Sequence, residues 1–320
     1  MSNKIIIAGG TGFLGQSIIR RLLENGYEII VLTRGKKEHS NGINYVHWDA
    51  KSTGAWIHKL EGSKAIINLV GKSVNCRYTA TNKREIIDSR VDATNAIGQA
   101  IASLKRPPEV WINAGSVAIF GDAGSEIKDE HSTTGTGFPA EVCKHWEAAF
   151  NSHRTLYTKK VLLRIGLVFQ KDIGLLQPFL KLAKFGFGNR FGNGNQYISW
   201  IHEKDFTHIV LQAIERKDYE GVIHAASPEP VTNKTFFKLL RSAVNIPFGI
   251  PLPAWLLQIG GQFAGTEAGL LLAGRRVVSK VLVEKDFVFS YPALETALDD
   301  LLHRETEAEE AIFADRPVLN

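Results

Sequence analysis

Three glycines near the start of the chain are spaced to bind the pyrophosphate of a dinucleotide. Gly9, Gly12 and Gly15 satisfy the pattern G-x-x-G-x-x-G. With Gly10 as its first member, the same segment also satisfies G-x-G-x-x-G. In such a motif one glycine makes a tight turn, one lets the backbone approach the phosphates, and one lets a helix pack closely on a strand. The alternative is a plain strand-to-helix turn that binds nothing.

The residues on either side supply the elements that the motif needs. The β-branched apolar run 4–8 predicts a strand, and the apolar spacing over 16–23 predicts a helix. A helix that starts directly after the glycines directs its free N–H groups and the positive end of its dipole towards bound phosphates. This order of strand, turn and helix favours the dinucleotide interpretation over the plain turn.

The end of the next predicted strand indicates which dinucleotide is bound. Residues 27–33 are typical of a strand, and Arg34 follows at the position where an NAD-binding protein is expected to place an acid for the ribose 2′-OH. The chain has no acid here before Glu38. A guanidinium binds a 2′-phosphate in a bidentate manner, so NADP(H) is the predicted cofactor. The alternative is a solvated basic turn.

Strands and helices alternate through the first half of the chain, which predicts a doubly wound Rossmann α/β fold with a parallel sheet. Further strands are predicted at 44–48, 65–70, 110–114 and 161–165, and helices at 82–104 and 140–152. Ligands of such sheets bind at the carboxyl ends of the strands. Arg34, Asp49, Gly71 and Ser116 follow predicted strands, so we expect them on one rim of the sheet.

The alternation weakens after residue 166, which predicts two parts. We expect an NADP(H)-binding domain at 1–166, to which parts of 197–226 return, and a smaller α+β substrate lobe at 167–320. Within the lobe, the Gly/Asn-rich segment 185–195 is either a mobile lid or a hairpin turn that needs positive φ. A short strand is predicted at 197–201 and an amphipathic stretch at 292–302, and the acidic tail 305–310 is expected to fray.

Composition predicts a soluble cytoplasmic protein that binds a small molecule. The chain is 44% hydrophobic and 22% charged, with a net charge of +5, and its basic residues are scattered. We therefore expect neither nucleic acid nor a membrane as a partner, and a monomer or a homodimer. Cys76 and Cys143 lie far apart, which indicates neither a disulfide framework nor a metal site. No secretory leader is apparent.

Several motifs together resemble the extended-type short-chain dehydrogenases/reductases, and more closely their atypical branch of sugar-nucleotide epimerase-like proteins. They span most of the chain: the glycine turn, Asn68-Leu69-Val70-Gly71, Arg77-Tyr78-Thr79, Ser89-Arg90-Val91-Asp92, Cys143-Lys144-His145-Trp146-Glu147, Ser199-Trp200-Ile201-His202, Arg275-Arg276-Val277-Val278 and Phe287-Val288-Phe289-Ser290-Tyr291-Pro292. The resemblance implies a Rossmann domain that binds NADP(H), and the small C-terminal domain of that branch. The predicted cofactor-binding residues are Gly9, Gly12, Phe13, Leu14, Gly15, Arg34, Asp49, Leu69, Gly71 and Arg90.

The catalytic pair that the resemblance implies does not carry over. Enzymes of this superfamily use a Tyr and a Lys four residues later, on one face of a helix, to move a proton. Where that pair is expected, this chain has Cys143 and Glu147. Cys143 is a candidate acid or base only if a cation lowers its pKa, and the alternative is a packed thiol.

The third superfamily position favours Ser116, whose hydroxyl either binds a substrate oxygen or completes the hydrogen bonds at the end of its strand. Phe120 stands where relatives often have a tyrosine. His202 is expected to anchor the lobe, and Asp205 to cap or begin a helix running to Arg216.

Two functions remain open from the sequence. The first is an NADP(H)-dependent oxidoreductase or epimerase-type enzyme that acts on a small polar or nucleotide-linked substrate. The second is a non-catalytic NADP(H)-binding sensor or interaction protein. The missing Tyr/Lys pair favours the second function, and the retained C-terminal part favours the first.

Overall fold

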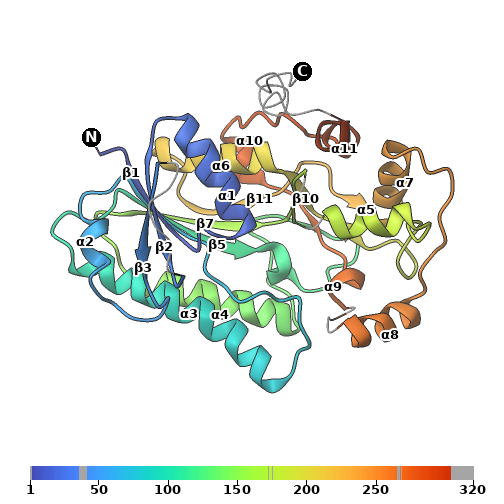
Figure 1. The fold of residues 1–320 in the computed structure, drawn as a ribbon, viewed down its shortest axis with the longest axis horizontal. Helices are drawn as coiled ribbons and strands as arrows, with labels where there is room; N and C mark the ends of the chain where they lie inside the picture. The colour runs from blue at the N-terminus through green and yellow to red at the C-terminus, as the bar shows by residue number, and fades with distance from the viewer. Residues whose placement is uncertain are drawn as a thin grey trace, which may run out of the picture.

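Seven parallel strands form the central sheet of the computed structural model, which describes residues 2–35, 42–171, 173–174, 176–264, 267 and 269–303. Their order is β11-β7-β5-β4-β1-β2-β3 (Figure 1). The strands are β1 (Lys4–Ala8), β2 (Glu28–Thr33), β3 (Ile43–His47), β4 (Ala65–Asn68), β5 (Val110–Ser116), β7 (Lys159–Ile165) and β11 (Gly221–Ala225). The predicted doubly wound Rossmann sheet is confirmed.

Helices cover both faces of this sheet, as its apolar strands require. On one face lie α1 (Phe13–Glu24) and α6 (Glu203–Glu215), and on the other α3 (Ala80–Ser103) and α4 (Phe138–Ser152) (Figure 1). Successive side chains of β1 point to opposite faces: Ile5 and Ile7 are buried with Ile18 of α1, and Ile6 is buried with Ile97 of α3. The sheet therefore sits between two apolar clusters.

The strand order reverses between β1 and β4, which is the point where ligands bind in this class of sheet. Ala8 at the end of β1 is in register with Asn68 at the end of β4, and Asn68 is in register with Asn113 of β5. The glycine turn, Leu69 and the last residues of β5 consequently lie on one rim of the sheet.

Local signals place the two helices that reach this rim. The side chain of Thr79 caps α3 by accepting a hydrogen bond of 3.2 Å from the backbone N of Asn82, so the helix starts two residues before its predicted start. Helix α4 starts after Gly137, whose φ is +91°, and has Pro139 in its first turn.

The strand β11 at the sheet edge and several short elements are not predicted by the sequence. The short elements are α2 (Ile57–Leu60), the 3₁₀ helix η1 (Val117–Phe120), β6 (Ile127–Lys128), β8 (Leu167–Phe169), β12 (Val231–Thr232) and β13 (Arg276–Val277). The single strand predicted at 197–201 is two, β9 (Tyr197–Ile198) and β10 (Trp200–His202), because the first pairs with β12 and the second with β8. After the segment from β8 to β10, which lies outside the main sheet, the chain returns to that sheet through α6 and β11.

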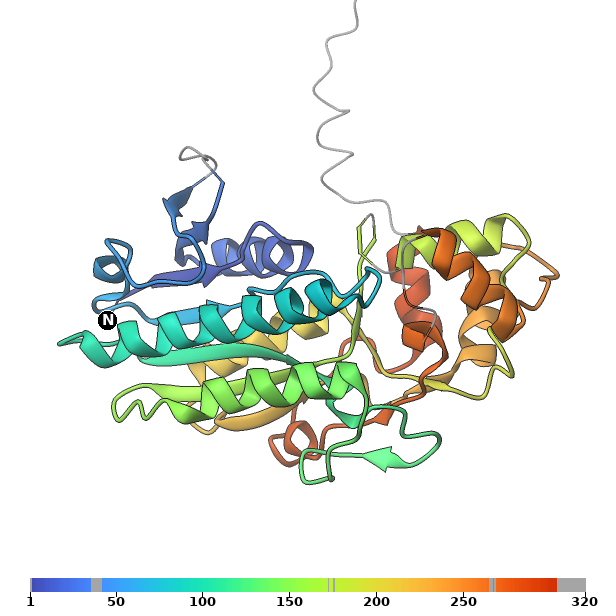
Figure 2. The ribbon, with the colours of Figure 1, turned by 90° about the horizontal axis from the view of Figure 1, so that it is seen from below.

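The second part of the molecule is mainly helical (Figure 2) and is held together by an aromatic core. Its helices are α5 (Leu176–Lys184), α7 (Asn233–Ala243), α8 (Ala254–Ala264), α9 (Gly269–Leu272) and α11 (Leu294–His303), whereas α10 (Lys280–Glu284) packs on the main sheet through Leu282. Phe179, Phe191, Phe236 and Phe237 are buried together with ring centroids 4.7–6.2 Å apart. This core is separate from the two clusters of the sheet. The predicted acidic tail 305–310 lies outside the described residues.

The Gly/Asn-rich segment 185–195 packs onto the second part of the molecule and does not form a hairpin. Gly192 and Gly194 have φ values of +57° and +77°, as expected for a turn that needs glycine. The backbone N of Phe191 donates to Asn233 Oδ1 at 2.8 Å, and the backbone N of Leu252 donates to Arg190 O at 2.9 Å. These contacts join the segment to α7 and to the start of α8.

Candidate functional site

The glycines of the turn between β1 and α1 have different surroundings and therefore different roles. Gly9 has a φ of +77°, and a Cβ on it would lie 3.1 Å from the backbone of Leu69. A Cβ on Gly15 would lie 2.5 Å from Gly10 Cα, so α1 and the turn pack too closely for a side chain there. A Cβ on Gly12 would meet only Gly9 O, at 3.6 Å. Two glycines thus serve packing, and the Gly12 position faces open space.

The N-terminus of α1 next to Gly12 is a favourable place for an anion. Gly12 is the N-cap and has no side chain to accept from the first N–H groups, and the first turn contains no acidic residue. Phe13 and Leu14 belong to this turn, and Phe13 is 40% exposed. The uncapped N–H groups and the helix dipole can therefore act on a ligand phosphate. These residues fit the pyrophosphate of a dinucleotide.

Arg34 and Asp49 stand at the ends of neighbouring strands. Arg34 is exposed directly after β2, and the segment 36–41 beyond it lies outside the described residues. The Asp49 carboxylate accepts hydrogen bonds of 2.9 Å from the backbone N–H groups of Lys51 and Ser52. Hydrogen bonds from Ser52 lower the pKa of Asp49 to about 2, so it carries its charge. Contact of either residue with the cofactor stays a prediction.

At the exit of β4, an arginine lies against a glycine. A Cβ on Gly71 would lie 2.8 Å from Arg90 Cζ, so a larger residue there would displace the guanidinium from its present position. Arg90 Nη1 donates to Lys72 O at 3.0 Å and to Ile86 O at 2.9 Å. The guanidinium also lies 5.0 Å from the ring of Trp146. Arg90 of α3 is thereby fixed between the end of β4 and α4.

A buried polar network below the rim joins two strands to two helices. Asn68 Nδ2 donates to Asn113 Oδ1 at 2.7 Å and to Thr94 Oγ1 at 3.2 Å. Trp146 Nε1 donates to the same Thr94 oxygen at 3.1 Å. Burial makes loss of any partner costly, which fixes the relative positions of β4, β5, α3 and α4. Sequence reasoning missed this positioning role, although an asparagine inside each of two apolar strands is a signal for it.

Ser116 ends β5 and caps η1. Its Oγ accepts a hydrogen bond of 3.2 Å from the backbone N of Ala118, as one of the two sequence interpretations expects. The hydroxyl proton remains available for another acceptor, and the side chain is half-buried. A role in binding a substrate oxygen stays a prediction.

Cys143 lies in an apolar environment on α4. It is 3% exposed and packs with Val117, Phe120 and Val277. Burial, and next the charge of Glu147, raise the pKa of the Cys143 thiol to about 12, although Arg90 and other arginines act in the opposite direction. The thiol therefore stays protonated near neutral pH, which is unfavourable for a base.

Glu147, one helical turn after Cys143, forms a buried ion pair with Arg164. Its two carboxylate oxygens each accept a hydrogen bond of 2.9 Å from Arg164 of β7, and both side chains are buried. Phe120 covers this pair, because Arg164 Cζ lies 5.6 Å from its ring. The two helix positions of the superfamily pair thus hold a neutral thiol and an ion-paired carboxylate.

His202 and Asp205 hold the C-terminal segment against α6. Asp205 accepts hydrogen bonds from the backbone N–H groups of Ser290 and Tyr291, at 2.7 and 2.9 Å. The N-cap of α6 is His202, not Asp205, since His202 Nδ1 accepts from the backbone N of Lys204 at 3.1 Å. Burial lowers the pKa of His202 to about 4, so the imidazole is neutral. Both residues anchor the chain, as expected for His202.

Tyr78 and Arg275 are two residues that sequence reasoning did not assign to the site. Tyr78 precedes α3, and its ring lies 4.6 Å from that of Phe138 at the start of α4. Arg275 lies between α9 and β13, and it acts electrostatically on both Tyr78 and Cys143. The sequence motifs at 77–79 and 275–278 include these two residues, but their positions in the sequence did not indicate that Arg275 lies near enough to Tyr78 to act on it.

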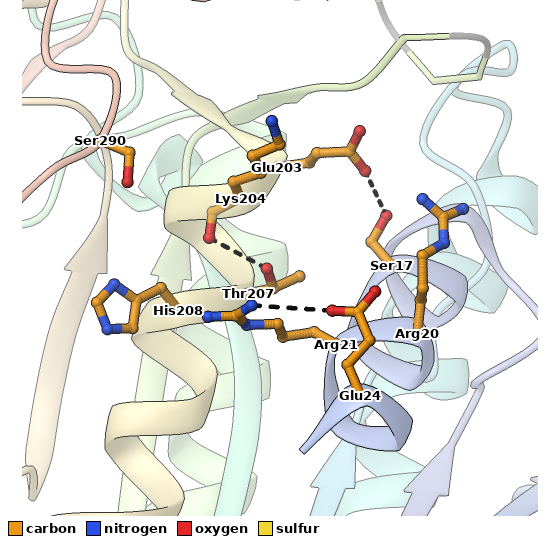
Figure 3. A pocket seen from close by; sticks show the side chains of 9 residues that line it. All are labelled: Ser17, Arg20, Arg21, Glu24, Glu203, Lys204, Thr207, His208 and Ser290. Atoms are coloured by element: carbon orange, nitrogen blue, oxygen red, sulfur yellow. Dashed lines mark hydrogen bonds and ion pairs between the residues drawn. The ribbon is translucent and has the colours of Figure 1, made fainter. Parts of the chain in front are cut away.

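A cavity of about 330 Å³ between α1 and α6 contains none of the predicted site residues (Figure 3). Ser17 Oγ points to Glu203 and donates to it at 2.7 Å, and Arg21 lies 3.8 Å from Glu24. Ser17 and Arg21 each already face a carboxylate of the cavity wall, and none of the predicted site residues lines it, so we place the candidate site at the rim. Elsewhere in the described ranges, no group of three metal-ligating side chains occurs and no helix is long and apolar enough to cross a membrane.

Comparison with known proteins identifies relatives over nearly the whole chain. Residues 5–159 match the model of the NAD dependent epimerase/dehydratase family, and residues 252–301 match a domain of unknown function, DUF1731. The epimerase family protein SSP1921 of Staphylococcus saprophyticus is 30% identical over 301 residues, which cover 93% of this chain and 99% of the relative. The epimerase family protein YfhF of Bacillus subtilis is 30% identical over 300 residues, which cover 93% and 97%.

Among solved structures, the human epimerase family protein SDR39U1, crystallised with NADPH, superposes with a TM-score of 0.83. It is 27% identical and the match covers 93% of this chain and 98% of the human chain. The C-terminal match confirms the predicted small domain of the atypical branch.

Proposed function

This chain belongs to the NAD dependent epimerase/dehydratase family, and on that premise we propose that it is an NADP(H)-dependent enzyme of the oxidoreductase or epimerase type that acts on a small polar substrate. The observation that carries the proposal is the open Gly12 position in front of the uncapped N-terminus of α1. A Cβ would fill the space that a pyrophosphate needs. The NADPH named in the human relative's structure supports the choice of cofactor.

The residues of the rim divide the work of binding and positioning. The N–H groups of Phe13 and Leu14 would hold the pyrophosphate, and Arg34 the 2′-phosphate. Asp49, Leu69, Gly71 and Arg90 would complete the cofactor site. NADP(H) supplies or accepts a hydride when bound, so the protein must orient the substrate and exclude water. Ser116 would donate a hydrogen bond to a substrate oxygen.

The experiment that tests this function is a search for turnover with stereospecifically deuterated NADPH. The protein is incubated with the labelled cofactor and a panel of small carbonyl compounds, and products are examined for deuterium by mass spectrometry. Transfer from one face of the cofactor supports the proposal. Tight NADPH binding with no transfer to any member of the panel would favour the sensor function. The neutral Cys143 thiol and the ion-paired Glu147 carboxylate are consistent with that function, because neither is suited to move a proton.

Replacing Arg34 with alanine is expected to weaken NADPH binding roughly tenfold to a hundredfold, because a charge-assisted bidentate phosphate contact is lost. NADH binding should hardly change, since NADH has no 2′-phosphate. Titration calorimetry measures both affinities. Arg154→Ala, an exposed arginine after α4, is the control for loss of one positive charge. Equal losses for both cofactors would remove Arg34 from the 2′-phosphate.

Ser116→Ala is expected to lower turnover by about one to a few factors of ten, on the order of the effect of losing a hydrogen bond in the transition state. Cys143→Ser should stay within roughly a few-fold of the parent, because a buried protonated thiol acts through packing. Both variants are compared at saturating NADPH once a substrate is known. An inactive Cys143→Ser beside a nearly normal Ser116→Ala would establish a thiol-based mechanism.

A further inference from the structure

Arg275 is a half-buried arginine without a partner for its side chain in the described part of the chain. Its Nε is fully covered and finds no acceptor within hydrogen-bond reach, and the guanidinium takes part in no ion pair there. The backbone is nevertheless held firmly: Arg275 N donates to Tyr197 O at 2.9 Å, and Ser199 Oγ donates to Arg275 O at 2.7 Å. The fold therefore fixes the backbone that carries a partly desolvated cation, and leaving its covered Nε without an acceptor is unfavourable unless a ligand supplies one.

Arg90 of α3 is a second half-buried cation, and part of its guanidinium is already satisfied. Its Nη1 is used by two backbone carbonyls, whereas its Nε and Nη2 have no acceptor among the described side chains and backbone groups. It also forms no ion pair with a carboxylate of the described ranges. Burial lowers the pKa of both Arg90 and Arg275, because removing water from a guanidinium disfavours its charged form.

The two arginines converge on the same side chains. Cys143 and Tyr78 each interact electrostatically with both of them. Val277, two residues after Arg275, packs against Cys143 and against Val117, the residue after Ser116. The hydroxyl of Tyr78 is also covered and has no hydrogen-bond partner in the described structure. Two polar groups without a partner in the described structure, Arg275 Nε and the Tyr78 hydroxyl, are thus brought to the part of the molecule that contains the neutral Cys143 thiol.

Nearby carboxylates limit the charge of a ligand here. Asp122 acts on Arg275 from beyond ion-pair distance, and its Oδ1 accepts from the backbone N of Gly274 at 3.0 Å. Glu267 Oε1 accepts from the backbone N of Tyr78 at 2.8 Å. Asp122 thus offsets part of the positive charge of Arg275, and Glu267 adds a negative charge beside Tyr78. A singly charged carboxylate is therefore favoured over a doubly charged phosphate.

We propose that Arg275 binds a carboxylate group of the substrate and that the Tyr78 hydroxyl donates a hydrogen bond to the same molecule. Arg275 offers an unused planar fork of N–H donors, the geometry that a carboxylate matches. The substrate class is then a small carboxylic acid. The inference rests on the proposed function in calling this molecule a substrate, but binding of the carboxylate does not require turnover.

The test uses pyruvate as the carboxylate probe and methyl pyruvate as its neutral counterpart. Binding of the ¹³C-labelled compounds to the full chain, with and without NADPH, is measured by NMR line broadening. Pyruvate should bind about tenfold or more tightly than the ester, and Arg275→Met should remove this preference. Arg276→Met is the matched control, because Arg276 is adjacent, carries the same charge and lies 4.9 Å from the ring of Tyr197.

A second measurement separates binding from a structural role. If the Arg275 charge is held for a ligand, Arg275→Met should keep or raise the melting temperature of the ligand-free protein, whereas a structural arginine would lower it. Equal pyruvate affinity in the Arg275 and Arg276 variants, no preference for pyruvate over its ester, or tighter binding of inorganic phosphate would each overturn the inference. If such a result is found but NADPH still binds, the carboxylate site is wrong and the proposed function is unaffected. If pyruvate binds but NADPH does not, the carboxylate site is supported and the proposed function is wrong.

Discussion

Gly12→Val is expected to abolish NADPH binding while the protein keeps its fold. The φ of Gly12 is −77°, which any residue adopts, and a Cβ there meets only Gly9 O at 3.6 Å. The valine would therefore disturb little of the protein itself. Its two methyl groups would occupy the space in front of the α1 N-terminus, so that the pyrophosphate could not approach the backbone. We expect a loss of about a hundredfold or more, which corresponds to at least ~2.7 kcal/mol.

Fluorescence titration with NADPH measures the binding, and circular dichroism with thermal unfolding measures the fold. Gly15→Ala is the contrasting variant. Its added methyl would lie 2.5 Å from Gly10 Cα and O, so this smaller change should destabilise the protein itself. A folded Gly12→Val protein that binds NADPH normally would contradict the assignment of the glycine turn to the cofactor.

The elements of the first half were predictable because their signals are local. The β-branched run of β1, the Asn25-Gly26 turn after α1 and the prolines after α3 all act through neighbouring residues. The strand β11 has no such signal: it is a five-residue strand that begins at Gly221 and joins the sheet only by pairing with β7. Its place depends on a surface that distant residues build.

The same distinction applies to the candidate site. The glycine turn and Arg34 were predictable because a strand end and a helix start define them within 35 residues of sequence. Cys143 and the two arginines that act on it electrostatically, Arg90 and Arg275, come from separate elements far apart in the chain. Spacing in the sequence contains no information about such contacts, so the resemblance could identify the motifs but not their convergence.

Glu147→Ala is expected to destabilise the protein by about 3–5 kcal/mol, because it leaves the Arg164 guanidinium buried without its carboxylate. Glu147 and Arg164 are 8% and 7% exposed and are joined by two hydrogen bonds of 2.9 Å. Near Arg164, the remaining polar contact is His224 Nε2 at 3.5 Å, and an imidazole cannot replace a carboxylate. Urea unfolding of the full chain measures the difference in the free energy of unfolding.

The double variant Glu147→Leu with Arg164→Met separates the value of the pair from the cost of breaking it. Removing both charges leaves no desolvated ion, so most of the lost stability should return. If the double variant is as unstable as Glu147→Ala, packing rather than the unpaired charge explains the effect, and the prediction is wrong.

This ion pair also bears on the chemistry of the site. Glu147 stands at the helix position where the superfamily lysine is expected, and a lysine there would face the Arg164 guanidinium in place of its carboxylate partner. Restoring the Tyr/Lys pair by Cys143→Tyr and Glu147→Lys should therefore give an unstable protein rather than an active reductase, because two buried cations would lie side by side. Thermal unfolding and NADPH turnover of that double variant decide the point. A stable, active product would show that Arg164 can be accommodated without Glu147, and that proton transfer from this helix face remains available to the fold.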